Sequence, residues 1–354
     1  MTTRGRPSRV VLALLVVGSV LLAGCGPDDD RHTSAARLPD GPVTVPAPRA
    51  GPFTAASVWK KNIAKAPLAA GSKAMARNLN GQVTDRYGGV AAFNVTQYNA
   101  SFYGVSKDQP RTTIAWDDCQ GKGSVPQGLY GPGGQFVGVP IPSSAVPSAG
   151  TDRSLVIYQK STDTMWDFWR IANRADGWHA CWGGRIDKVS TSKGFFTGSF
   201  GASASGLSLI GGAVGIKEAQ AGRIDHALAL AIPNPAVHTR VSWPAQRSDG
   251  FDTSPAAIPE GTRLRLDPRV KVSTLKLHPI AKMIARAAQK YGFIVTDKSG
   301  AVAVVTESGA GVQARTGTNP WNALMQGTPD YLIMKNFPWD KLQALPKNYG
   351  KPKR

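Results

Sequence analysis

Residues 155–182 decide the fold, and they read LVIYQKSTDTMWDFWRIANRADGWHACW. Apolar and aromatic residues gather there in three short runs, at 155–158, 165–171 and 178–182. A Lys-Ser-Thr-Asp turn separates the first two runs, and an Asp-Gly turn precedes the third. Short strands joined by tight turns pair with their neighbours in antiparallel order. The stretch therefore predicts a three-stranded antiparallel meander.

The rest of the chain extends this β-rich pattern. Its 39 glycines and 26 prolines supply turn-forming residues for many short strands. The clearest helix spans 279–291, with Pro279 suited to its first turn and Gly292 to its C-terminal cap. Ile280 and Ile284 share one face of that helix. We expect a mainly β protein, an antiparallel β-sandwich with a jelly roll as one form of it, that carries this packed helix in its C-terminal half and long loops.

Composition also divides the chain. We expect a signal peptide at 1–24, a lipidated cysteine and a proline-rich tether at 25–52, and a single β-rich domain at 53–354. The tether holds six prolines and an Asp-Asp-Asp run without a sustained apolar period, so it is expected to be extended. The domain is expected to end in an irregular C-terminal extension after about residue 307.

The first 25 residues indicate secretion. Three arginines precede an apolar run at 10–22, which is shorter than the roughly 20 residues that a membrane span needs. The ending Leu22-Ala23-Gly24-Cys25 resembles the lipobox of bacterial lipoproteins. That resemblance implies that Cys25 is lipidated and anchors the protein to the cell membrane at its extracytoplasmic face. The alternatives are an ordinary signal peptide with a chance cysteine and an uncleaved anchor.

The chain is strongly basic, because 42 lysines and arginines against 23 aspartates and glutamates give a net charge of +19. Outside the cytoplasm this charge favours anionic partners such as lipid headgroups and acidic wall polymers. The alternative is a dispersed solvated surface, since basic residues gather only in the tail at Lys347, Lys351, Lys353 and Arg354. We expect the membrane and an acidic or wall glycan as partners, and no specific nucleic acid; the sequence does not indicate the oligomeric state.

Lipidation of one of the three cysteines leaves Cys119 and Cys181 as a pair. In an oxidising compartment an even pair predicts a disulfide. Two cysteines with His179 would still leave a structural zinc site incomplete. We therefore predict a disulfide, no metal site and no cofactor.

Aromatic residues on the predicted meander suggest a binding surface. Trp166, Trp169, Trp178 and Trp182 fall within a short stretch, and strand alternation places them on both faces of the sheet. A sandwich buries one inner face, so outer aromatics need a covering element or a ligand such as a sugar ring, with His179 among the polar neighbours. The alternative is that all of these aromatics are core.

Candidate catalytic residues are few. His226 lies on the apparent core face of the run 227–232, which favours a structural histidine over a general acid or base. No G-x-S-x-G elbow and no H-E-x-x-H helix occurs in the sequence. A carboxylate pair for glycoside hydrolysis could come from six aspartates: Asp152, Asp163, Asp167, Asp176, Asp187 and Asp225.

Several segments together resemble a family of secreted bacterial proteins without a characterised activity. These include Gly150 to Val156, Met165 to Trp169, Trp178 to Gly184, Asp225 to Leu228 and Trp243 to Arg247, and the resemblance covers most of 53–306. The family's usual Asp-Arg-His reads Asp152-Arg153-Ser154 here, so a histidine that could assist His226 is missing. The departure argues against catalysis in this chain.

The leading functional hypothesis is a surface-anchored lipoprotein that binds extracellular or cell-wall polysaccharide. Its candidate ligand-binding residues are Trp166, Trp169, Trp178, His179 and Trp182. One alternative is a polysaccharide lyase or glycoside hydrolase that uses Asp152, Arg153, His226 and Gln246. A second is a structural or partner-binding envelope protein. Fold alone does not choose among them.

Overall fold

The structure is a computed structural model that describes residues 51–353. The expected signal peptide at 1–24, the lipidation of Cys25 and nearly all of the expected tether lie outside the described residues. The described residues belong to one compact unit.

Short strands and few helices make up this unit. The helices are α1 (Ser72–Thr84), α2 (Ile216–Gln220), α3 (Pro279–Lys290), α4 (Ala310–Thr316) and α5 (Trp321–Leu324). The strands in the first half are β1 (Ala100–Val105), β2 (Ala115–Trp116), β3 (Ser154–Gln159), β4 (Thr164–Trp169), β5 (Ala172–Arg174), β6 (Gly177–Ala180) and β7 (Trp182–Ile186). The later strands are β8 (Leu228–Ile232), β9 (Arg263–Leu266), β10 (Phe293–Lys298), β11 (Ala303–Val304) and β12 (Leu342–Ala344).

The strands form three sheets with the orders β1-β3-β4-β7, β11-β8-β10-β9-β12 and β2-β6-β5. Each sheet contains one parallel pair, namely β1 with β3, β8 with β10 and β2 with β6. The other pairs are antiparallel. The expected mainly β class is confirmed, and the sheets are mixed rather than purely antiparallel.

The predicted meander is half right. β3 and β4 form the expected antiparallel hairpin, with Ile157 opposite Trp166. The expected third strand is broken at Cys181, because β6 pairs with β5 in the three-stranded sheet and β7 begins at Trp182. β7, not β6, is the second neighbour of β4. The break places Trp178 and Trp182 in different strands of different sheets, although the sequence predicts one strand over 178–182.

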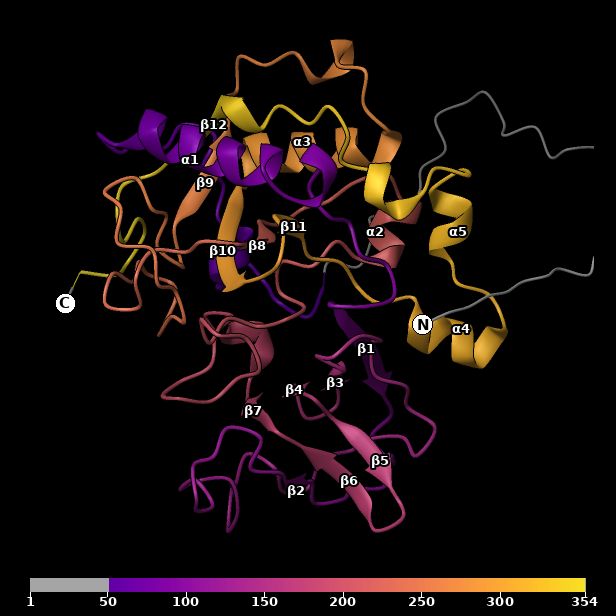
Figure 1. The fold of residues 1–354 in the computed structure, drawn as a ribbon. Helices are drawn as coiled ribbons and strands as arrows, with labels where there is room; N and C mark the ends of the chain where they lie inside the picture. The colour runs from indigo at the N-terminus through magenta and orange to yellow at the C-terminus, as the bar shows by residue number, and fades with distance from the viewer. Residues whose placement is uncertain (1–50, 354) are drawn as a thin grey trace, which may run out of the picture. The chain divides into compact units, whose positions relative to one another are not determined.

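The two larger sheets share a core. One cluster of buried side chains contains Val156 and Met165 of the four-stranded sheet together with Ala229 and Ile294 of the five-stranded sheet. The other face of the five-stranded sheet is covered by α1 and α3 (Figure 1), whose buried residues pack with Phe293 and its neighbours. Alternation along the strands therefore places one sheet between the helices and the second sheet, as in a sandwich with a helical outer layer.

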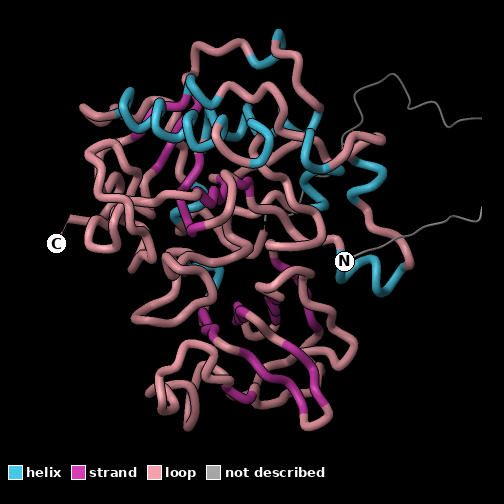
Figure 2. The backbone as a smooth tube through the Cα atoms, in the orientation of Figure 1, coloured by secondary structure: helices cyan, strands magenta, loops and turns pink. Residues whose placement is uncertain are grey.

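Long loops occupy much of the backbone (Figure 2), as the glycine and proline content predicts. One of them covers the far face of the four-stranded sheet. Ile114, Leu129, Phe136 and Val139, from the segment between β1 and β3, pack with Trp166 and its neighbours in a third buried cluster. The chain thus supplies its own cover for the aromatic residues on this face.

The predicted C-terminal-half helix is confirmed as α3. Pro279 occupies its first turn, and the ring of His278 accepts a hydrogen bond from the Ile280 amide at 3.2 Å. Gly292 follows the helix with φ +76°, and a Cβ there would lie 2.5 Å from the carbonyl oxygen of Leu264. Only glycine meets both demands at this cap.

The segment after residue 307 is more regular than expected. It contains α4, α5 and β12, and β12 pairs with β9 at the edge of the five-stranded sheet. Leu342 and Ala344 of this strand are buried in the cluster that contains Phe293 and the buried residues of α1 and α3. Among the helices of residues 51–353, none has both the length and the apolar character of a membrane span.

Candidate functional site

Most of the tryptophans expected to stack on sugars belong to the core. Trp166, Trp178 and Trp182 are 2%, 6% and 6% exposed. Phe200 stacks on Trp182 at a centroid distance of 5.8 Å, and the ammonium of Lys122 lies 3.8 Å from the Trp182 ring centre. Both of these neighbours come from the protein itself. The core alternative therefore describes these three residues.

Trp169 and His179 are partly accessible, but the chain uses their polar atoms. The indole NH of Trp169 donates to Asp152 at 3.1 Å. The ring nitrogens of His179 lie 3.0 Å from carboxylate oxygens of Asp117 and Asp176. Both ring nitrogens of His179 are therefore engaged by carboxylates of the chain itself.

Among the four proposed catalytic residues, His226 alone is buried. His226 is 3% exposed, and its ring nitrogens lie 2.9 Å from Glu218 and from the carbonyl oxygen of Ala227. Within residues 51–353, no hydrogen bond or ion pair joins any two of Asp152, Arg153, His226 and Gln246. With both ring nitrogens of His226 engaged, the structure favours the structural interpretation of this histidine.

Each of the six aspartates considered for a carboxylate pair contacts another group of its own chain. In sequence order, they contact these groups of their own chain: Trp169, Ser190, the Leu209 amide, His179, Arg185 and Arg223.

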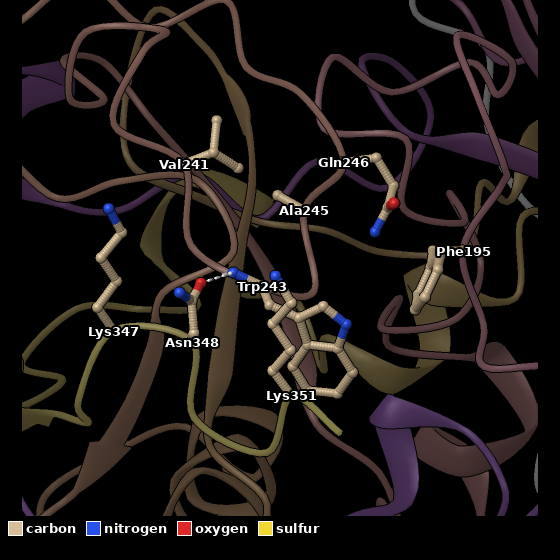
Figure 3. Close-up of a pocket in the computed structure, with 8 residues that line it drawn as sticks. All are labelled: Phe195, Val241, Trp243, Ala245, Gln246, Lys347, Asn348 and Lys351. Atoms are coloured by element: carbon tan, nitrogen blue, oxygen red, sulfur yellow. Dashed lines mark hydrogen bonds between the residues drawn. The ribbon is translucent and has the colours of Figure 1, made fainter. Parts of the chain in front are cut away.

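A surface pocket lies elsewhere, at the loop that follows β8. Its volume is about 500 Å³. Eight residues line it: Phe195, Val241, Trp243, Ala245, Gln246, Lys347, Asn348 and Lys351. Lys347 and Asn348 lie on one side of Trp243, with Gln246 and Phe195 on the other (Figure 3). Of the residues predicted to carry function, Gln246 is the one that this pocket contains.

Two hydrogen bonds bring the C-terminal tail to this loop. The Trp243 amide donates to Oδ1 of Asn348 at 2.8 Å, and the Asn348 amide donates to the hydroxyl of Ser242 at 3.0 Å. This reciprocal pair fixes the basic tail beside the loop, so Lys347 and Lys351 reach the pocket wall. The tail, which the sequence shows only as a charged end, thereby becomes part of a defined surface.

The pocket combines aromatic, amide and cationic groups. Phe195 meets Trp243 edge to face at a centroid distance of 6.4 Å, and Trp243 is only partly buried. The Gln246 side-chain NH₂ donates to the Pro244 carbonyl at 2.7 Å, which leaves its carbonyl oxygen as an acceptor. None of the eight lining residues is acidic. Such a lining can stack a sugar ring and attract a negative group on it.

The loop itself is fixed from inside by Arg247. Its guanidinium donates to the carbonyl oxygens of Phe200, Gly201 and Ser203 at 2.8–2.9 Å. Burial lowers the pKa of Arg247 from its usual value. Arg247 directly follows Gln246 in the chain. Because its guanidinium is held by three carbonyl oxygens, the segment that carries Trp243 and Gln246 is held in place.

Sequence reasoning missed Phe195, Trp243 and Asn348 as site residues. Trp243 and Gln246 are neighbours in a segment quoted for the family resemblance, but nothing local marks the indole as exposed. Comparison of the chain with protein-family models, curated proteins and solved structures found no match. The pocket is therefore the feature from which the function is inferred.

Proposed function

We propose that the protein binds an acidic extracellular polysaccharide in the pocket around Trp243. The observation that carries this proposal is that one pocket is lined by the Trp243 ring, with Phe195 edge to face against it, and by Lys347 and Lys351. Sugar rings present apolar C–H faces to aromatic side chains, while carboxylate or phosphate groups on the glycan meet the lysines. Trp243 thus replaces the tryptophans of residues 166–182 as the proposed sugar-stacking residue.

Replacement of Trp243 by alanine is expected to weaken binding of a polyuronate or a teichoic-acid polymer about tenfold, because the stacking surface is lost. Binding is measured by titration of tryptophan fluorescence or by calorimetry. Tyr331→Ala is the matched control, since Tyr331 is a half-exposed aromatic that does not line the pocket.

A double Lys347→Ala, Lys351→Ala variant separates the charge contribution from stacking. It should bind more weakly at low salt and show a flatter salt dependence, because exposed charges are screened beyond about 10 Å at 0.1 M salt. Unchanged binding in both the Trp243 and the double-lysine variant contradicts the proposal. Failure of the unaltered protein to bind any glycan favours a structural or partner-binding envelope protein instead.

The location of the folded part is indicated by its disulfide. Cys119 and Cys181 are joined, with a Cα–Cα distance of 5.4 Å, as parity predicted. Disulfides persist mainly in oxidising compartments, so the folded part is of the kind found outside the cytoplasm. We further propose that lipidated Cys25 attaches it to the membrane, as the Leu22-Ala23-Gly24-Cys25 lipobox resemblance supports.

Replacement of Cys25 by alanine is expected to release the protein from the membrane fraction or to block its processing, because diacylglycerol can no longer be attached. Fractionation and intact mass of the isolated protein measure both effects. Ser34→Ala is the matched control, because it replaces a small residue outside the lipobox and leaves the disulfide intact. Unchanged membrane retention and mass in the Cys25 variant would count against the anchor.

A further inference from the structure

Three carboxylates meet behind the pocket loop. They belong to Asp249 in the loop, Glu260 just before β9, and Asp297 in β10. One oxygen from each lies within 4.8 Å of the other two. Glu260 is completely buried, Asp297 is partly buried and Asp249 is exposed. The cluster therefore reaches from the interior to the solvent.

Backbone contacts enforce this convergence. The Ser242 amide donates to the Glu260 carbonyl at 2.9 Å, and the Gly261 amide donates to the Val295 carbonyl at 2.7 Å. Gly261 has φ +85°, and a Cβ there would lie 1.6 Å from the carbonyl oxygen of Ser242. The close approach of the loop to the strands is thus built into the chain, and it places Glu260 beneath Asp249.

The chain balances the negative charge of the cluster only in part. The ammonium of Lys298 lies 3.4 Å from Asp249, on the solvent side. Arg247 is close enough to interact with the charges of Asp297 and Glu260, but its guanidinium donates its hydrogen bonds to backbone carbonyls. Both side-chain oxygens of Glu260 are buried, and in the described part of the chain neither makes a hydrogen bond of ordinary geometry, although Ser248 and Asp249 lie beside them. A buried carboxylate without a well-formed hydrogen bond is costly, so a positively charged species from outside the chain would stabilise it.

Two species could do so, a proton or a cation. Burial, with the charges of Asp297 and Asp249, raises the pKa of Glu260 to about 10. Burial also raises the pKa of Asp297, to about 7, with Asp249 and Asp152 as further negative neighbours. A cation that binds these carboxylates displaces any protons that they carry.

The donor set fits a hard cation. Carboxylate oxygens without nitrogen or sulfur donors are typical of Ca²⁺ rather than zinc or copper sites. Ca²⁺ binds oxygens at about 2.3–2.6 Å, so two ligands on opposite sides of the ion lie roughly 5 Å apart. The spacing of the three oxygens is within that span. The exposed side at Asp249 leaves room for the water ligands that complete a Ca²⁺ shell.

We propose that Asp249, Glu260 and Asp297 form a binding site for a divalent cation of the calcium class. The ion joins the pocket loop to β10 and to the segment that leads into β9. The site stands apart from glycan binding, because none of its three residues lines the pocket. Nothing in the sequence spacing indicates it, since its ligands come from three separate segments.

The test uses the full chain, treated with chelator and titrated with CaCl₂. Calorimetry should find one ion bound, and at about 100-fold excess over the dissociation constant the melting temperature should rise by roughly 5 °C. Glu260→Gln, which resembles the protonated side chain, should melt within about 2 °C of the calcium-free protein and show no such rise. Asp340→Asn is the matched control, because Asp340 is an exposed carboxylate paired with one lysine.

Asp249→Asn keeps the test decisive if the Glu260 variant does not fold. Asp249 is exposed, so its replacement disturbs no core and should weaken calcium binding about tenfold or more. An unchanged melting temperature of the unaltered protein on adding calcium overturns the proposal, and so does a full calcium response in the Glu260 variant. Trp243→Ala should bind calcium normally, so failure of the glycan proposal is recognised separately.

Discussion

Replacing Asp167 by asparagine should stabilise the protein at about pH 8 by as much as about 4 kcal/mol, and should change its stability near pH 4 very little. Asp167 lies in β4 and is completely buried in the layer between the two larger sheets. One carboxylate oxygen accepts the Leu209 amide at 2.7 Å, while the other has no partner. Burial raises the pKa of Asp167 to about 7.

The sign follows from proton uptake. At a pH above 3.8, the ordinary pKa of an aspartate, the Asp167 carboxyl has lost its proton in the unfolded chain. In the folded protein it keeps this proton up to about pH 7. The unfolded state then binds fewer protons, so this residue makes stability fall as the pH rises through that window. Asparagine resembles the protonated carboxyl and cannot ionise, which removes this loss.

Urea unfolding of both proteins at several pH values between about 4 and 8 measures the effect. Asp187→Asn is the control. Asp187 directly follows the neighbouring strand β7, and its exposed carboxylate is paired with Arg185. A stability difference between Asp167→Asn and the unaltered protein that is constant across this pH range would contradict the assignment of the buried charge.

Local patterns predicted the parts of the fold that local interactions determine. The β3–β4 hairpin needs only two apolar runs and a four-residue turn, and α3 needs a proline start, an apolar face and a glycine after its end. Both elements are present. The fold class followed from the same reasoning, because the β-rich pattern recurs along the chain.

Long-range pairing was not predictable from those patterns. β1 and β3 pair in parallel although a long loop separates them, and β12 returns from the C-terminal segment to join β9. The break at Cys181 is equally hidden, since residues 178–182 read as one continuous strand. The break arises because the two halves of this segment pair with different sheets, β6 with β5 and β7 with β4. The pattern of apolar residues along one strand does not indicate such a change of partner.

The candidate site shows the same limit. Trp166 and Phe168 share one face of β4, but strand alternation does not reveal that Phe136 and its loop cover that face. The pocket depends on hydrogen bonds between Trp243 and Asn348, which are 105 residues apart. A buried aromatic and a binding aromatic have identical side chains, so only tertiary contacts distinguish them.

Loss of the Cys119–Cys181 disulfide should lower the free energy of unfolding by about 4 kcal/mol, because the bond closes a loop of about 60 residues in the unfolded chain. The native contacts around it do not depend on the bond. Ala115 and Trp116 pair with β6, and the Asp117 amide donates to the Ala180 carbonyl at 3.0 Å. The folded structure is therefore expected to persist after reduction, with the loss arising from the greater freedom of the unfolded chain.

Urea unfolding with and without reductant measures this loss. The reduced protein and a Cys119→Ala, Cys181→Ala double variant should unfold at similar urea concentrations, both well below the oxidised protein. The double variant is also the control, because reductant should leave its midpoint unchanged.

Cys181 is buried and Cys119 is exposed, so a free pair would show rapid alkylation of Cys119 in the native state. Two results would show that this cysteine pair does not constrain the chain. One is such alkylation without reductant, and the other is an oxidised protein whose urea midpoint of unfolding does not change when reductant is added.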